Sequence, residues 1–109
     1  SHPAFAGVSL GLLHGSQPDA LVICHDLNRD HMRGLPQSQV PSIEDTIRLN
    51  LEAARLTNPN VKVAGIAVNT SSVSVEEGKA ICARLNKQFS LPCVDPVRDS
   101  ADSIVAALV

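Results

Sequence analysis

Residues 20–26 read ALVICHD, and this stretch decides the fold class. Its first five residues form an unbroken apolar run, which is typical of a strand covered on both faces within a parallel sheet. Residues 61–68 and 91–94 repeat the pattern of an apolar run that ends on polar residues. The sequence therefore predicts three strands of one parallel sheet.

Segments with a helical pattern lie before, between and after these strands in the sequence. Apolar residues recur at three- and four-residue spacing near residues 3–15, 43–57, 74–89 and 99–108, and this spacing indicates helices. An order in which helices alternate with strands implies right-handed crossovers and helices packed on a parallel sheet. Because the length suits one domain and not two, we expect a single α/β domain over residues 1–109.

Local signals predict where these helices begin and end. Ser42 and Ser74 each precede an acidic residue by three positions, which is typical of a helix N-cap. Gly15 is expected to end the first helix and Asp99 to cap the last. The apolar stripe of the first helix is Phe5, Val8 and Leu12. Residues 26–41 show no regular pattern and are expected to form a long functional loop.

The composition excludes several classes of function. The formal net charge is −2, and Phe5 and Phe89 are the only aromatic residues. Neither an electrostatic footprint nor a base-stacking platform is present, so we expect no nucleic-acid partner. No apolar run approaches the roughly 18 residues of a membrane-spanning helix, so we expect no membrane partner.

Cysteine and histidine spacing gives no metal signature. The cysteines are Cys24, Cys82 and Cys93, and the histidines are His2, His14, His25 and His31. Neither set matches the spacing of a zinc site. We therefore expect no metal, and we expect the cysteines to be small buried residues in a reducing, cytoplasmic environment.

Polar residues follow each of the three predicted strands. They are His25, Asp26, Asn69, Thr70, Asp95 and Arg98. Ligands of open parallel sheets bind beyond the carboxyl ends of the strands, so these residues predict a binding cleft. His31 and Arg33 in the following loop add groups for proton transfer or an anionic substrate. The alternative is that these residues only begin turns, cap helices or solvate a loop.

The stretch SHPAFAGVSLGLLHGSQPDALVICHD at residues 1–26 resembles the C-terminal domain of the DgcN-type D-glutamate N-acetyltransferases. The resemblance continues through GIAVNTS at residues 65–71 and LPCVDPVR at residues 91–98. It implies a three-layer, parallel-sheet P-loop NTPase-like (Rossmann-like) fold. This chain would be the C-terminal portion, without the Walker A strand. Its expected partner is the remainder of a longer polypeptide, with an N-terminal Rossmann-like domain, in a cytoplasmic homo-oligomer.

The activity that the resemblance implies is acetyl transfer from acetyl-CoA to the amino group of D-glutamate, a small-molecule substrate. A general base must remove the proton of that amine, and His25 or Asp26 is expected in this role. Arg33 and Arg98 are candidates for binding the substrate carboxylates. Ser1, His2 and His31 are further candidates for substrate contacts.

The fold also resembles dethiobiotin synthetase, in which an Asn at the end of a late strand contacts adenine. Asn69 stands at the matching position, so Asn69, Thr70 and Asp95 are expected to bind the cosubstrate. Two alternatives stay open from the sequence. One is an ATP-dependent, Mg²⁺-requiring ligase or kinase, and the other is a non-catalytic nucleotide-binding domain. The chain itself contains neither a GxxxxGK[ST] nor a GxGxxG phosphate loop.

Overall fold

The structure is a computed structural model that describes residues 2–109. Its elements in chain order are η1 (Pro3–Phe5), α1 (Ala6–Ser16), β1 (Ala20–Asp26), β2 (His31–Met32), β3 (Leu35–Gln39), α2 (Ile43–Arg55), β4 (Lys62–Asn69), α3 (Val75–Phe89), β5 (Cys93–Val94) and α4 (Asp102–Ala106). The chain divides into two compact units. The first contains the described residues up to Leu21 with Asp30–Lys62, and the second contains Val22–Arg29 with Val63–Val109.

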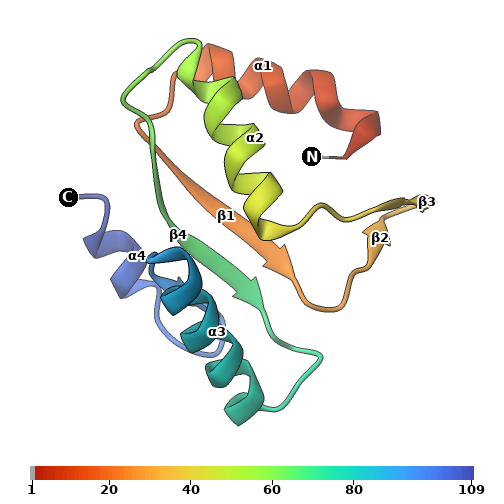
Figure 1. Ribbon diagram of the computed structural model, residues 1–109, viewed down its shortest axis with the longest axis vertical. Helices are drawn as coiled ribbons and strands as arrows, with labels where there is room; N and C mark the ends of the chain where they lie inside the picture. Colours follow the sequence, from red (N-terminus) through yellow and green to blue (C-terminus); the bar gives the residue numbers. More distant parts are fainter. Residues whose placement is uncertain (1) are drawn as a thin grey trace. The chain divides into compact units, whose positions relative to one another are not determined.

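A three-stranded sheet in the order β1-β4-β5 confirms the predicted α/β class. Strands β1 and β4 run side by side in the same direction (Figure 1). Strand β4 pairs with β5 in parallel, with Ile66 opposite Cys93 and Ala67 opposite Val94. The second unit is built around this sheet, and its buried apolar side chains are Ile23, Ala64, Ile66, Val68, Cys82, Leu85, Cys93 and Ile104.

Glycine allows α4 and the segment before β5 to approach β4 closely. A Cβ atom at Gly65 would lie 2.7 Å from Cγ1 of Ile104 and 2.9 Å from the carbonyl oxygen of Pro92. The same Pro92 oxygen accepts a hydrogen bond from the Ile66 N–H at 2.8 Å. A side chain at position 65 would therefore push α4 and the β5 segment away from the sheet.

The first unit contains α1, α2 and the short sheet of β2 and β3. Nε2 of His14 donates to the carbonyl oxygen of Ala53 at 2.9 Å, which joins α1 to α2. The Asn58 amide donates to the carbonyl oxygen of Pro18 at 3.0 Å and to Oδ1 of Asp19 at 3.1 Å. These bonds hold together the segments that precede β1 and β4.

The predicted N-caps of α2 and α3 are confirmed. Oγ of Ser42 accepts from the Asp45 N–H at 3.0 Å, and Oγ of Ser74 accepts from the Glu77 N–H at 3.1 Å. Both bonds satisfy helical N–H groups that would otherwise lack a partner.

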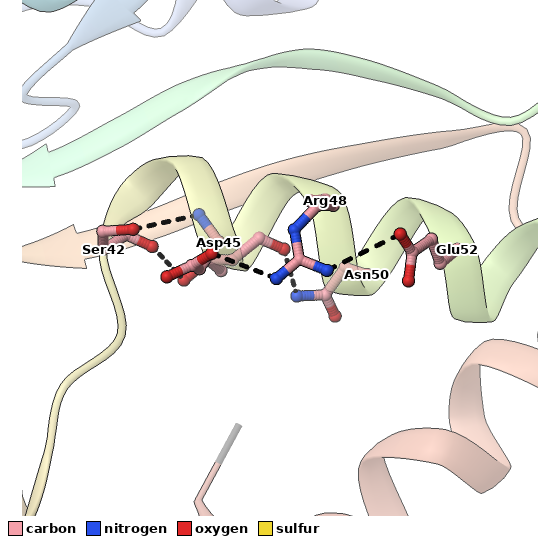
Figure 2. Close-up of polar contacts among 6 residues, drawn as sticks. Ser42, Asp45, Arg48, Asn50 and Glu52 are labelled. Atoms are coloured by element: carbon pink, nitrogen blue, oxygen red, sulfur yellow. Dashed lines mark hydrogen bonds and ion pairs between the residues drawn. The ribbon is translucent and has the colours of Figure 1, made fainter.

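An ion-pair ladder continues along the exposed face of α2 (Figure 2). Arg48 lies 3.1 Å from Asp45 and 3.6 Å from Glu52. The hydrogen bond between Arg48 and Asp45 lowers the pKa of the carboxyl group and raises the pKa of the guanidinium. This polar face complements the apolar stripe that the sequence places on the other side of the helix.

The predicted irregular loop over residues 26–41 is wrong, because β2 and β3 form an antiparallel hairpin there. Gly34 supplies the turn with a φ of +76°, a conformation that other residues rarely adopt. A hydrogen bond from the Val40 N–H to the Asp30 oxygen, at 3.0 Å, closes the base of the hairpin.

Two predicted helix boundaries are also wrong. Helix α1 ends at Ser16 with Gln17 as its C-cap, which adopts the left-handed conformation with a φ of 49°, and Gly15 remains inside the helix. The N-cap position of α4 is Ala101, and the Asp102 N–H donates to Oγ of Ser100 at 3.1 Å. Asp99 lies in the preceding turn, where its N–H donates to the backbone carbonyl oxygen of Asp95 at 2.8 Å. At both positions another residue of the same turn takes the place that the sequence signal indicated.

Two predictions about buried side chains, one for α1 and one for β1, are wrong in the described residues. Phe5, Val8 and Leu12 are between 60% and 66% exposed, and no residue of α1 is buried. In β1, Ile23 is buried while its neighbours Val22 and Cys24 are exposed. Successive side chains of a strand point to opposite faces, so one face of β1 is covered and the other is open. Within residues 2–109, no helix is both long and apolar enough to cross a membrane.

Candidate functional site

A cavity of about 670 Å³ opens at the carboxyl ends of β1, β4 and β5, and all of its lining residues belong to the second unit. The lining residues come from the three strand ends and the turns that follow them: Cys24, His25, Asp26, Arg29, Ala67, Val68, Asn69, Ser71, Asp95, Pro96, Val97 and Arg98. The carboxyl edge of a parallel sheet is where ligands of this fold class bind. The cavity is therefore the candidate functional site.

Five of the six residues predicted at the strand ends line this cavity, and the sixth, Thr70, is buried next to it. Sequence reasoning missed Arg29, Ser71 and Cys24. Arg29 stands three residues after Asp26, a spacing that allows a local ion pair, so the sequence held a signal for it. Cys24 was expected to be buried, and that prediction was wrong because its side chain points to the exposed face of β1.

The end of β1 presents His25 and Asp26 to the cavity. The Leu27 N–H donates to the backbone carbonyl oxygen of Asn69 at 3.3 Å, which joins the end of β1 to the end of β4. The Asp26 carboxylate accepts from the Asn28 N–H at 2.9 Å and lies 3.3 Å from Nε of Arg29. In the described part of the chain the His25 ring has no hydrogen-bond partner. Its imidazole can therefore exchange a proton with a ligand.

Asn69 ends β4 with its amide group at the cavity. Its Oδ1 accepts from the Ser71 N–H at 3.0 Å, which fixes the side chain in a local turn. This bond occupies the carbonyl oxygen and leaves the two N–H groups of the amide as donors. A ligand with hydrogen-bond acceptors fits this position.

Asp95 joins the end of β4 to the end of β5 through hydrogen bonds of its side chain. Its side chain is only 4% exposed. Oδ2 accepts from the backbone N–H of Thr70 at 3.0 Å and from its hydroxyl at 2.5 Å. Oδ1 accepts from the N–H groups of Val97 at 2.9 Å and Arg98 at 3.2 Å. Burial alone would raise the pKa of Asp95, but these hydrogen bonds outweigh it and lower the pKa to about 2. The carboxylate is therefore ionised at neutral pH.

Arg98 is held by the same cluster. Its Nη1 donates to the carbonyl oxygen of Val73 at 2.8 Å and to the hydroxyl oxygen of Thr70 at 3.3 Å. The Thr70 hydroxyl in turn donates to Asp95. The guanidinium is thus fixed at the cavity by a chain of hydrogen bonds that ends on a buried carboxylate.

The other predicted substrate contacts belong to the first unit. Nδ1 of His2 accepts from the Ala4 N–H at 3.1 Å, and Nε2 donates to the Arg33 oxygen at 2.7 Å. The structure thus brings His2 and Arg33 together. Nδ1 of His31 donates to the carbonyl oxygen of Met32 at 3.0 Å. Ser1 lies outside the described residues.

The two buried cysteines have little thiolate character. Burial raises the pKa of Cys82, and burial raises the pKa of Cys93 to about 12. In the described part of the chain, no group of three or more His, Cys, Asp or Glu side chains is arranged to hold a metal ion.

Comparison with known proteins shows which family this chain resembles. The P-loop domain of DUF1611 (DUF1611_C), described as a domain of unknown function, matches residues 1–105. A D-glutamate N-acetyltransferase of Pseudoalteromonas sp. is 72% identical over 108 residues, which are 99% of this chain and 32% of that protein. A D-glutamate N-acetyltransferase of Tritonibacter scottomollicae is 43% identical over 107 residues, which are 98% of this chain and 32% of that protein.

A solved structure extends the comparison to the fold. The crystal structure of a DUF1611 family protein from Anabaena variabilis has a TM-score of 0.87 at 33% identity, over 98% of this chain and 32% of that one. The chain thus spans about a third of the length of the curated relatives that it matches. The expected P-loop NTPase-like fold is confirmed, and the chain belongs to the DUF1611 family through its C-terminal P-loop domain.

Proposed function

We propose that this chain is the C-terminal part of an enzyme that transfers an acetyl group from acetyl-CoA to the amino group of D-glutamate. The observation that carries the proposal is the 72% identity over 108 residues to a protein named D-glutamate N-acetyltransferase. The remainder of a longer polypeptide, with the phosphate loop that this sequence lacks, would complete the active site. That the enzyme works as a cytoplasmic homo-oligomer is part of the same proposal and rests on the family resemblance alone.

The reaction requires a neutral amine, because an ammonium group has no lone pair for attack on a thioester. In our proposal His25 accepts the proton, the amine attacks the acetyl carbonyl, and CoA leaves as its thiol. The ring of His25 lines the cavity and has no hydrogen-bond partner among residues 2–109, which supports this role. Asp26 is the weaker candidate for the base, because Asn28 and Arg29 already engage its carboxylate.

Substrate binding is proposed first for residues of the second unit, which also contains His25. Arg98 would bind a carboxylate, since a guanidinium matches that group with two parallel hydrogen bonds. The donor groups of Asn69 would contact the adenine of CoA, as its place at the end of β4 supports. His2, His31 and Arg33 belong to the first unit, and their role as substrate contacts stays a prediction from the sequence. The ring of His2 makes two hydrogen bonds, and the ring of His31 contacts Met32 and Asp30, so Arg33 is the strongest candidate of the three.

Turnover of the complete enzyme tests this proposal. Purified full-length protein is mixed with acetyl-CoA and D-glutamate, and N-acetyl-D-glutamate is quantified by chiral liquid chromatography and mass spectrometry. L-glutamate serves as the matched control for the acceptor, and ATP with Mg²⁺ and acetate replaces acetyl-CoA in a parallel reaction. We expect acetyl transfer that needs acetyl-CoA, prefers the D-enantiomer and proceeds without ATP. Turnover that needs ATP, or no acetylation of D-glutamate, would overturn the proposal.

A further inference from the structure

We propose that Thr70 and Asp95 are positioning residues that orient Arg98, so that the free edge of its guanidinium binds an anionic oxygen group of a substrate. The expectation from sequence was that Thr70 and Asp95 contact the cosubstrate themselves. Their burial and their hydrogen bonds support a different role. The inference deepens the proposed function and rests on it for the identity of the anion.

The hydrogen bonds of Arg98 divide its guanidinium into a bound side and a free side. An arginine side chain has five N–H donors. The two on Nη1 are used by the carbonyl oxygen of Val73 and the hydroxyl oxygen of Thr70. In the described residues no acceptor is bonded to Nε or Nη2. These two nitrogens share one edge of the guanidinium, and this edge binds carboxylate or phosphate through two parallel bonds.

Thr70 can accept from Arg98 because its own proton is committed elsewhere. Its hydroxyl donates to Oδ2 of Asp95 at 2.5 Å, which turns the lone pairs of the oxygen toward Nη1. Thr70 is 1% exposed, so water does not compete with Asp95 and Arg98 for its hydroxyl group. The chain of bonds from Arg98 through Thr70 to Asp95 therefore fixes the direction of the guanidinium.

Asp95 also positions the backbone of Arg98. Oδ1 accepts from the N–H groups of Val97 and Arg98, so one carboxylate holds the turn after β5 and the turn after β4 together. With the bond from the Thr70 hydroxyl, the buried Asp95 carboxylate accepts four hydrogen bonds. These bonds occupy the lone pairs of the carboxylate, so none is left to accept a hydrogen bond from a substrate. Asp95 therefore acts on the substrate through Arg98.

Arg98 and Arg29 both line the cavity, and the Asp26 carboxylate already pairs with Arg29. The free edge of Arg98 therefore has no competing carboxylate among the contacts of the described residues. An anionic oxygen group of the right shape comes from two sources in the proposed reaction. One is a carboxylate of D-glutamate and the other is a phosphate of CoA.

Equilibrium binding to the full-length protein tests the inference by a double-mutant cycle. Isothermal titration with D-glutamate and, separately, with CoA is carried out on the parent, Arg98→Ala, Thr70→Val and the double variant. We expect Arg98→Ala to raise the Kd of one ligand at least about tenfold, and that ligand identifies the anion. We expect Thr70→Val to raise the same Kd about three- to tenfold alone and less than about twofold in the Arg98→Ala background.

Thr70→Ser is the matched control, because it keeps the hydroxyl and is expected to bind within about twofold of the parent. Equal effects of Thr70→Val with and without Arg98 would overturn the positioning role and leave Thr70 purely structural. Unchanged binding of both ligands in Arg98→Ala would overturn the anion site. If Thr70→Val does not fold, Asp95→Asn enters the same cycle with the same two criteria. Because the readout is binding, a protein that fails to acetylate D-glutamate can still confirm the coupling.

Discussion

Asp95 holds four hydrogen-bond donors on a buried carboxylate, and this arrangement makes stability depend on pH. Its pKa in the folded protein is about 2, below the roughly 3.9 of a solvated Asp. The unfolded state therefore binds the proton first as the pH falls, and protonation favours unfolding. The contribution of Asp95 to stability is present above about pH 4 and is lost as the pH approaches 2.

Denaturant unfolding of the parent and of Asp95→Asn between pH 2 and pH 6 checks this prediction. We expect the difference in free energy of unfolding to be largest above about pH 4 and to shrink as the pH falls through the acid range. A difference of the same size at every pH would contradict the account of Asp95 as an ionised hydrogen-bond acceptor.

Gly78 gives a second prediction at the scale of one residue. It lies inside α3, and a Cβ atom there would stand 2.8 Å from the hydroxyl oxygen of Thr70. Ala is the better helix former by about 1 kcal/mol, yet we expect Gly78→Ala to destabilise the protein by about 1–3 kcal/mol through overpacking. Gly11→Ala in α1 is the matched control, because the space around Gly11 is open. A Gly78→Ala protein at least as stable as the Gly11→Ala protein, measured by denaturant unfolding, would contradict the packing argument.

The helices that could be predicted best are those whose ends depend on local chemistry. Ser42 and Ser74 cap α2 and α3 because a hydroxyl reaches an N–H group three residues ahead in the chain. The β2–β3 hairpin could not be predicted in this way. It turns at Gly34, and the His2 ring bonds to the backbone oxygen of Arg33 in that turn, 31 residues away. Sequence periodicity does not report contacts at that separation.

The cap of α2 leads to a prediction at the scale of one element. Ser42→Ala removes the acceptor for the Asp45 N–H and is expected to cost about 1 kcal/mol in the free energy of unfolding. Arg48→Ala on the same helix removes only exposed ion pairs and is expected to cost less. Thermal or urea unfolding of the two variants side by side checks the order. A larger loss for Arg48→Ala would show that the ladder in Figure 2, not the cap, stabilises the helix.

At the scale of the whole molecule, the location of the site could be predicted from the sequence, but the hydrogen bonds within the site could not. Parallel strands place their carboxyl ends on one edge, so His25, Asn69 and Asp95 were expected together, and they line one cavity. The bond between Thr70 and Asp95 joins residues 25 positions apart. Both residue types are common in turns, so nothing in the sequence showed whether these two residues bond to each other in the interior or contact a ligand.

The length of the relatives gives another prediction at this scale. The chain spans about a third of each curated relative, and its sequence has no phosphate-binding glycine loop. We expect the 109-residue chain alone to catalyse no acetyl transfer at enzyme and substrate concentrations at which the full-length protein turns over. The same thiol-release assay on both proteins is the check. Robust activity of the short chain would mean that its own cavity is a complete active site.

The kinetics of His25→Ala in the full-length enzyme test the central claim most directly, namely that the cavity at the strand ends is where the acetyl group is transferred. A general base contributes about 10²- to 10⁴-fold to turnover. The account predicts a fall in kcat of that order, with little change in KM for D-glutamate. Turnover by His25→Ala at the rate of the parent would remove His25 from the mechanism and contradict the assignment of the cavity.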